Sequence, residues 1–224
     1  MTPTFSPRLE ILPAAQRRLW PELAETPADF TLYGGTAIAL RLAHRQSVDF
    51  DFFALASFEP NALLNKIRYL RDAVLRQASR NTLSVTVDRG GPVQLSYFGE
   101  LGIGQVAPPD HVEGPGFPVA SLIDLAGMKV ATLPQRVELR DYLDIHALLT
   151  KARISLSEML AAAGIIYGAQ FNALISLKAI TYHKDFTLAD LPKGVREDLV
   201  EAAQATDIRK LPKLSVFRKR EADS

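Results

Sequence analysis

The 224-residue sequence contains no cysteine. This absence excludes disulfide frameworks, zinc sites built on thiolates and cysteine nucleophiles. Long apolar runs are missing too, since no segment approaches the roughly 18 apolar residues that a membrane helix needs. The first residues also lack the basic region and apolar stretch of a secretory signal. We therefore expect a cytoplasmic protein with no membrane partner.

The chain has almost no excess of charge of either sign. It contains 26 lysines and arginines against 25 aspartates and glutamates, a net charge of +1, which predicts no strong general attraction to nucleic acid. With 47% hydrophobic and 23% charged residues, the composition is that of a folded globular protein. The length favours one elaborated domain or a core with a smaller lobe.

The hydrophobic periodicity divides the chain into two regions. In the first, strands are expected over 30–33, 47–53, 82–88 and 93–98, the last two as a hairpin, and helices over 11–23, 36–44 and 59–77. Glycines and prolines then concentrate over 99–118, a pattern typical of a loop or of a short strand plus linker. Helices are expected over 121–133, 140–149, from a cap at Ser155, over 169–182 and over 195–205. We predict an α+β domain over 1–118 and an all-α C-terminal region over 119–224.

Two carboxylates stand out in the strand expected over 47–53. Asp49 and Asp51 alternate with two phenylalanines, so both carboxylates project from one face of the strand. Neighbouring like charges repel each other, and a Mg²⁺ ion shared with phosphate oxygens would relieve that repulsion. The alternative, which a DxD pattern alone favours, is that both carboxylates lie on the solvent face of an edge strand.

Gly34 and Gly35 follow the first expected strand and precede the helix over 36–44. Glycines at this place let the backbone amides of a helix N-terminus approach a phosphate, although an isolated pair is more often a plain tight turn. Here the order is strand, glycine pair, helix and DxD strand. This order places an anion cradle beside a metal-binding pair and predicts phosphoryl or nucleotidyl transfer.

The segment GGTAIALRLAHRQSVDFDFF, Gly34 to Phe53, closely resembles the signature of the AbiEii/AbiGii-type nucleotidyltransferase toxin family. A second block, LIDLAGMKVATLPQRVELRDYLDIHALL from Leu122 to Leu149, resembles a later motif of the family, a helix bearing lysine followed by RDxxDL. The resemblance implies a nucleotidyltransferase-like mixed β-sheet with flanking helices, Mg²⁺ (or Mn²⁺) and an NTP as substrate. It further implies transfer of a nucleoside monophosphate to an acceptor, with tRNA or another RNA as the candidate, and an antitoxin encoded nearby.

The resemblance also assigns roles to individual residues by motif position. The metal ligands would be Asp49 and Asp51, and the catalytic set would be completed by Lys129 and Asp144. The nucleotide-binding candidates are Gly34, Gly35, Thr36, Arg45, Ser47 and Lys129, and the secondary candidates are Arg140 and Asp141. We expect Lys129 to lie on a helix face at the edge of the cleft and to meet a phosphate as a point charge.

The second block has a structural alternative. Asp141 and Asp144 are three residues apart and share one helix face. Lysine on a helix is most often solvated, and acidic and basic residues on such a face most often form surface salt bridges worth little energy. On this alternative, Lys129, Arg140 and both aspartates take no part in the reaction.

The sequence departs from many nucleotidyltransferases where they present a third carboxylate. In the strand expected over 93–98, Gln94 and Ser96 hold the alternating positions, and Asp144 is our candidate substitute. The missing acid supports another function, that of a catalytically degenerate member that binds nucleotide, RNA or a protein partner. A nucleic-acid-binding module is a third possibility, since 208–220 holds six basic residues and no acid, although such a run is more often a disordered tail.

Overall fold

The computed structural model describes residues 3–182 and 190–220 of the chain, which fall into two compact units. We call them the sheet unit, residues up to Gly102 together with Pro109–Ala120, and the helical unit, Ile103–Pro108 together with the residues from Ser121 onward. The short segment Ile103–Pro108 thus belongs with the helices although it precedes the last part of the sheet unit. The sequence-based division into domains 1–118 and 119–224 stays a prediction.

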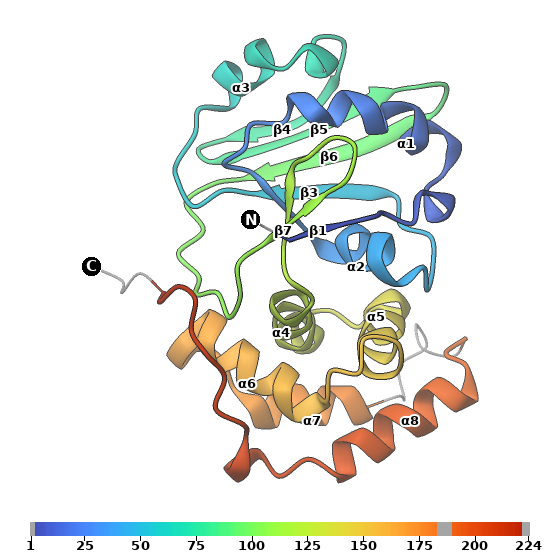
Figure 1. Ribbon diagram of the computed structural model, residues 1–224, viewed down its shortest axis with the longest axis vertical. Coiled ribbons are helices and arrows are strands. Elements are labelled where there is room, and N and C mark those ends of the chain that lie inside the picture. Colours follow the sequence, from blue (N-terminus) through green and yellow to red (C-terminus); the bar gives the residue numbers. More distant parts are fainter. Residues whose placement is uncertain (1–2, 183–189, 221–224) are drawn as a thin grey trace. The chain divides into compact units, whose positions relative to one another are not determined.

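The sheet unit is built on one sheet, whose elements are labelled in Figure 1. Its strands are β1 (Thr4–Phe5), β2 (Thr31–Tyr33), β3 (Asp49–Phe53), β4 (Val74–Ser79), β5 (Thr82–Asp88), β6 (Pro92–Phe98), β7 (Asp110–Val112) and β8 (Pro118–Val119), and its α-helices are α1 (Ala14–Leu19), α2 (Gly34–Leu42) and α3 (Pro60–Lys66). The order across the sheet is β1-β7-β8-β2-β3-β6-β5-β4. Strand β3 pairs with β2 antiparallel and with β6 parallel. The predicted mixed sheet with flanking helices, and the β5–β6 hairpin within it, are therefore confirmed.

One face of this sheet forms the core of the unit. Phe50 and Phe52 of β3 are fully buried, and the ring of Trp20 lies 6.3 Å from that of Phe50. On the same face, the buried hydroxyls of Tyr69 and Tyr97 share a hydrogen bond of 2.6 Å. Because successive side chains alternate across a strand, the opposite face of β3 and β6 carries half-buried and exposed side chains.

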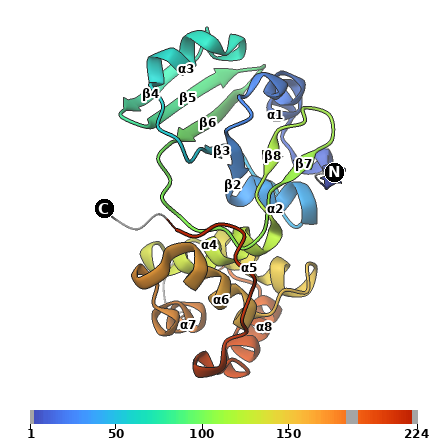
Figure 2. The ribbon, with the colours of Figure 1, turned by 60° about the vertical axis from the view of Figure 1, so that its left-hand side comes forward.

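Strands β7 and β8 come from 99–118, the region rich in glycine and proline. Figure 2 shows them as a hairpin beside β2, where β8 pairs with β2 in parallel. Arg41 of α2 fixes the hairpin, because its guanidinium lies 2.6 Å from Asp110 and donates to the carbonyl of Ala120 at 2.9 Å. Burial lowers the pKa of Arg41, and Asp110 opposes that shift.

The helix expected over 59–77 is wrong in its second half. Helix α3 ends at Lys66, and the chain then enters the antiparallel strand β4 beside β5. Every residue of β4 is exposed, including Val74 at 58% and Leu75 at 52%. A strand with neither face buried has no alternating hydrophobic pattern, so only its long-range pairing shows it.

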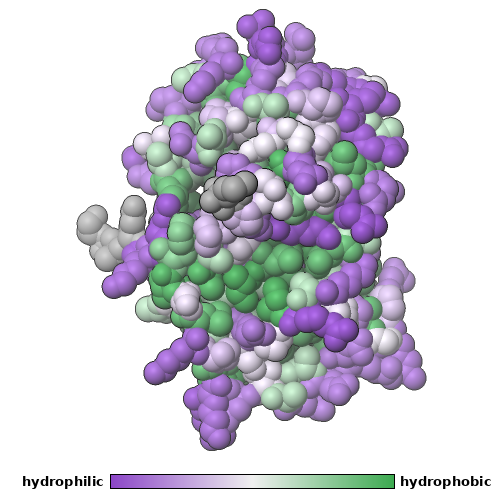
Figure 3. Space-filling view, viewed as in Figure 1, coloured by the Kyte–Doolittle hydropathy of each residue, from purple (hydrophilic) through white to green (hydrophobic). Residues whose placement is uncertain are grey.

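The helical unit contains five α-helices in the part of the chain that the structure describes. They are α4 (Leu122–Thr132), α5 (Leu139–Thr150), α6 (Leu156–Tyr167), α7 (Ala173–Thr181) and α8 (Lys193–Gln204). The predicted cap of α6 is confirmed as a capping box between Ser155 and Glu158. Hydrophilic side chains cover the outer surfaces of α3 and α8 (Figure 3). Across 3–182 and 190–220, no helix has the length and apolar character needed to cross a membrane.

The basic segment 208–220 is attached to the helical unit. The backbone of Gln105 and that of Arg218 exchange hydrogen bonds of 2.9 and 3.0 Å, and Arg220 donates to the carbonyl of Tyr167 at 3.0 Å. The alternative of a disordered tail is therefore wrong for the described residues of this segment.

Candidate functional site

The N-terminus of α2 meets a carboxylate of β3. Helix α2 begins at Gly34, directly after β2 ends at Tyr33. Gly34 has φ +75°, and a Cβ placed on it would lie only 2.8 Å from Oδ2 of Asp51. This position therefore requires glycine both for its backbone conformation and for the close approach of the carboxylate. The positive end of the helix dipole favours negative charge at this point.

Asp49 and Asp51 lie on a central strand of the sheet. Strand β3 is hydrogen-bonded to β2 on one side and to β6 on the other, so the edge-strand alternative is wrong. Both aspartates are half-buried on the face opposite to the aromatic core. Their Cα atoms are about 7 Å apart, two residues along a strand, and both carboxylates therefore face the same side of the sheet.

Thr36 and Ser47 connect α2 to the start of β3. Their hydroxyls share a hydrogen bond of 2.7 Å, and the Thr36 hydroxyl also donates to the backbone carbonyl of Asp49. Both side chains are buried, Thr36 at 1% and Ser47 at 8% exposure. They fix the position of the first aspartate, and their role in nucleotide binding stays a prediction. Arg45, in the loop between the two elements, donates to the carbonyl of Gln46 at 2.8 Å.

The strand register shows which side chains accompany the two aspartates. Asp49 is aligned with Gln94 of β6, and Asp51 with Ser96. The hydroxyl of Ser84 on β5 donates to that of Ser96 at 3.3 Å. The neighbouring strand thus contributes an amide and a hydroxyl at these two positions, as the sequence predicted, and not a third acid.

The second sequence block forms a buried ion cluster within the helical unit. Nζ of Lys129 on α4 lies 2.8 Å from Asp141 and 2.9 Å from Asp144, both on α5. Lys129 is 7% exposed, and both aspartates are fully buried. The alternative of a solvated Lys129 is therefore wrong, and so is that of weak surface salt bridges for these three residues. The role of Lys129 toward a phosphate stays a prediction.

Arg136 completes this cluster, and the sequence analysis missed it. Its Nε lies 3.0 Å from Asp141, so two cations balance the two buried carboxylates. Arg136 is itself exposed, and nothing in its local pattern indicates that it contacts a buried carboxylate. Arg140, one of the secondary candidates, instead contacts Glu138 on the surface through its half-exposed guanidinium.

Comparison with known proteins identifies the family. The family described as "Nucleotidyl transferase AbiEii toxin, Type IV TA system" matches residues 18–216, nearly the whole chain. The chain belongs to the AbiEii nucleotidyltransferase toxin family. A relative, protein aq_aa25 of Aquifex aeolicus (strain VF5), is 29% identical over 159 residues, which cover 70% of this chain and 75% of that protein.

Solved structures share the fold of this chain. A putative nucleotidyltransferase from H. pylori is 17% identical with a TM-score of 0.55, covering 84% of this chain and 90% of that one. JHP933 from Helicobacter pylori is 18% identical with a TM-score of 0.55, over 84% and 87% of the two chains. MenT4, the nucleotidyltransferase toxin Rv2826c from Mycobacterium tuberculosis H37Rv, is 12% identical with a TM-score of 0.57, over 85% and 83%. At these identities the likeness concerns the fold, whereas the family match shows that this AbiEii member is a nucleotidyltransferase.

A divalent metal fits the donor set of β3 in this AbiEii member. Mg²⁺ is usually held by one or two carboxylates together with substrate phosphates, and it keeps several waters. Asp49 and Asp51 supply two hard oxygen donors on one face, beside a helix N-terminus that favours phosphate. Among the described residues, no group of three acidic or histidine side chains could hold a metal. A metal at this place would therefore depend on phosphate oxygens of the nucleotide.

Proposed function

We propose that this protein catalyses a metal-dependent transfer of a nucleoside monophosphate from an NTP to an RNA acceptor, with tRNA as the first candidate. Asp49 and Asp51 hold Mg²⁺ (or Mn²⁺), and the amides at Gly34, Gly35 and Thr36 bind phosphate. We further propose that it acts in the cytoplasm as the toxin of a pair whose antitoxin is encoded by a neighbouring gene.

One observation carries this proposal: a carboxylate of the central strand lies against the first glycine of α2. Oδ2 of Asp51 would be only 2.8 Å from a Cβ at Gly34. A carboxylate beside a helix N-terminus places the negative group that a metal needs next to the amides that a phosphate needs. The family match supports nucleotidyl transfer as the reaction that uses both.

The proposed reaction exchanges one phosphorus–oxygen bond for another. A hydroxyl oxygen of the acceptor forms a bond to the α-phosphorus, the bond between that phosphorus and the bridging oxygen breaks, and pyrophosphate leaves. When bound, the metal neutralises phosphate charge and polarises the α-phosphoryl oxygens. Thr36, itself hydrogen-bonded to Ser47, holds the backbone carbonyl of Asp49, so the start of β3 is in place before the nucleotide arrives.

We also propose that Lys129 and Asp144 serve this reaction as positioning residues, because Asp144 is fully buried. A water molecule receives the proton of the acceptor hydroxyl. Support comes from the resemblance of the second block to the family motif and from the pairing of the two side chains at 2.9 Å. Ser96, aligned with Asp51, supplies a hydroxyl and no carboxylate beside the two aspartates. Asp141 and Arg136 hold the lysine and its partners in a fixed arrangement.

The experiment incubates the protein with each of the four NTPs, labelled with ³²P at the α-phosphate, and total RNA, with and without Mg²⁺. We expect label to enter RNA only with metal, and we expect Asp49→Asn and Asp51→Asn each to reduce transfer at least 100-fold. Asp72→Asn, a change at an exposed aspartate of the same unit, is the matched control and should leave transfer unchanged. Transfer that survives both changes in β3 would exclude the proposed site, and metal-dependent NTP binding without transfer would favour a binding protein.

A further inference from the structure

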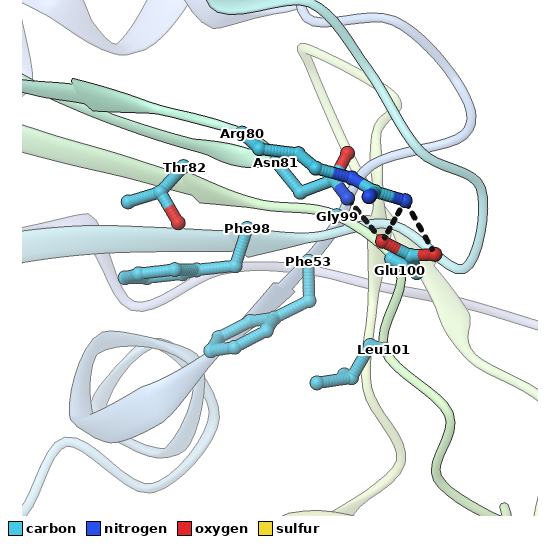
Figure 4. Close-up of a pocket in the computed structure, with 8 residues that line it drawn as sticks. All are labelled: Phe53, Arg80, Asn81, Thr82, Phe98, Gly99, Glu100 and Leu101. Atoms are coloured by element: carbon cyan, nitrogen blue, oxygen red, sulfur yellow. Dashed lines mark hydrogen bonds and ion pairs between the residues drawn. The ribbon is translucent and has the colours of Figure 1, made fainter. Parts of the chain in front are cut away.

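A pocket lies at the C-terminal ends of β3 and β6, two residues beyond Asp51 on β3. Phe53 follows Asp51 by two residues on the same face of β3, and Phe98 holds the aligned position on β6. The pocket has a volume of about 620 Å³ and is lined by residues of the sheet unit. Those that the argument uses are Phe53, Phe98, Arg80, Asn81 and Glu100 (Figure 4).

Two aromatic rings form one wall of the pocket. The rings of Phe53 and Phe98 are stacked, with centroids 4.9 Å apart and planes 27° from parallel. The edge-to-face contact of Tyr33 with Phe53, at 5.2 Å and 77°, holds this pair against β2. Both phenylalanines are nevertheless only half-buried. The fold therefore presents a preformed aromatic surface on the side of the sheet where the carboxylates lie.

The opposite wall is polar (Figure 4). The guanidinium of Arg80 lies 3.3 Å from both carboxylate oxygens of Glu100, and the side-chain amide of Asn81 donates to the same carboxylate. Asn81 is 8% exposed, and its Oδ1 accepts from the backbone of Phe58 at 2.8 Å. The side chains of Arg80 and Glu100 remain 79% and 56% exposed, so they can still bond to a ligand.

The backbone is also unusual at this wall. Asn81 and Glu100 both have φ +57°, a left-handed conformation that residues other than glycine seldom adopt. Such conformations cost free energy and concentrate at functional sites. Asn81 lies in the two-residue turn between β4 and β5, where asparagine often adopts this conformation. Its side chain bonds to Glu100, which also holds the guanidinium of Arg80.

We propose that this pocket is a nucleobase subsite, in which a base stacks on the Phe98 ring of the aromatic pair while its polar edge meets Arg80 and Glu100. The inference rests on the proposed function, because it places a nucleotide on the face of Asp49 and Asp51. Two residues along β3 span about 7 Å, a length comparable to the ribose that separates a phosphate from its base. Stacking accepts every base, whereas the Glu100 carboxylate would favour bases that offer amino hydrogens.

The test compares dissociation constants for each of the four NTPs with that for inorganic tripolyphosphate, which has the charge but no base, by calorimetry in Mg²⁺. Phe98→Leu should weaken NTP binding by about 5- to 150-fold, the range for loss of one stacked base, and leave tripolyphosphate binding unchanged. Phe98→Trp, which keeps an aromatic face, should retain most of the affinity. Phe217→Leu, at an exposed phenylalanine of the helical unit, is the matched control and should change neither constant.

A second variant keeps the proposal testable if Phe98→Leu fails to fold. Arg80 is exposed, so Arg80→Ala should fold normally, and we expect it to change the ranking of the four NTPs but not the binding of tripolyphosphate. The alternative is that the base in this pocket belongs to the RNA acceptor and not to the NTP. It is tested by measuring the dissociation constant of a mixed-sequence single-stranded RNA 12-mer that ends in a 3′-hydroxyl. Weaker binding of this RNA with unchanged NTP constants assigns the subsite to the acceptor's base.

Unchanged constants for both NTPs and RNA in Phe98→Leu and Arg80→Ala would overturn the inference. Failure of the proposed function gives a different result from failure of the subsite. In that case wild-type protein would show no Mg²⁺-dependent binding of tripolyphosphate, and Asp51→Asn would leave its dissociation constant unchanged. Loss of the subsite alone leaves tripolyphosphate binding and its dependence on Asp51 intact.

Discussion

Replacement of Gly34 by alanine should disrupt both the sheet unit and its reaction. The backbone at this residue has φ +75°, which costs roughly 1–2 kcal/mol for a residue with a Cβ. The new Cβ would also lie 2.8 Å from Oδ2 of Asp51, so the carboxylate or the start of α2 must shift. We expect the free energy of unfolding to fall by about 2–3 kcal/mol in total, and transfer to fall further because the Asp51 carboxylate is displaced.

The assay is urea denaturation together with the rate of nucleotidyl transfer per folded molecule. Gly164→Ala is the matched control, because Gly164 lies within α6 and a Cβ there would meet nothing within 4 Å. That change should raise the free energy of unfolding by about 0.5–1 kcal/mol, since alanine restricts the unfolded chain and favours helix. Transfer by this control should equal that of wild type.

A double-mutant cycle separates the two contributions at Gly34. In an Asp51→Ala background the clashing oxygen is absent, so Gly34→Ala should cost only the backbone part, roughly 1–2 kcal/mol. Equal costs in both backgrounds would show that the carboxylate does not restrict this position. Wild-type stability and transfer in the single variant would refute the account of the helix N-terminus altogether.

Other consequences concern buried polar groups. Lys129→Met should lower the free energy of unfolding by about 3–5 kcal/mol, because it leaves two buried carboxylates with one cation fewer. Lys178→Ala, at an exposed helix position, should stay within about 0.5 kcal/mol of wild type in the same urea denaturation. Burial raises the pKa of Tyr69 to about 12. Its contribution to the free energy of unfolding should therefore be complete below about pH 10, the ordinary tyrosine pKa, and be lost as the pH rises through about 12. Denaturation at several alkaline pH values should show a weaker pH dependence of stability in Tyr69→Phe than in wild type. Asp124→Ala should lower the free energy of unfolding by about 1–3 kcal/mol. It should also speed hydrogen exchange at the backbone amides of Val106 and Ala107, which donate to this carboxylate. Unchanged exchange at these amides would show that the carboxylate does not protect them.

Local signals were enough to predict the element that carries the proposed site. The glycine pair at Gly34 marks a turn, and the DFDFF alternation of β3 identifies a strand with one buried face. Three residues containing Gly90 and Gly91 join β5 to β6, which is typical of a hairpin. Each of these patterns lies within a few residues of sequence.

Features that depend on distant partners escaped the sequence analysis. Strand β4 is an exposed edge strand that only its pairing with β5 defines, and β7 is only three residues long. The charges of Lys129 and Arg136 are typical of a surface. The burial of Lys129, and the contact of both residues with Asp141, depend on α5 packing beside α4. Periodicity does not report which charged residues on two helices meet.

The most direct test of the central claim is to follow two labels of one nucleotide. Wild-type protein, Mg²⁺ and total RNA are incubated with the same NTP labelled with ³²P either at the α-phosphate or at the γ-phosphate. Transfer of a nucleoside monophosphate predicts that the α-label enters RNA and that the γ-label is recovered only as pyrophosphate. Entry of the γ-label into RNA, or of neither label with any of the four NTPs, would contradict it.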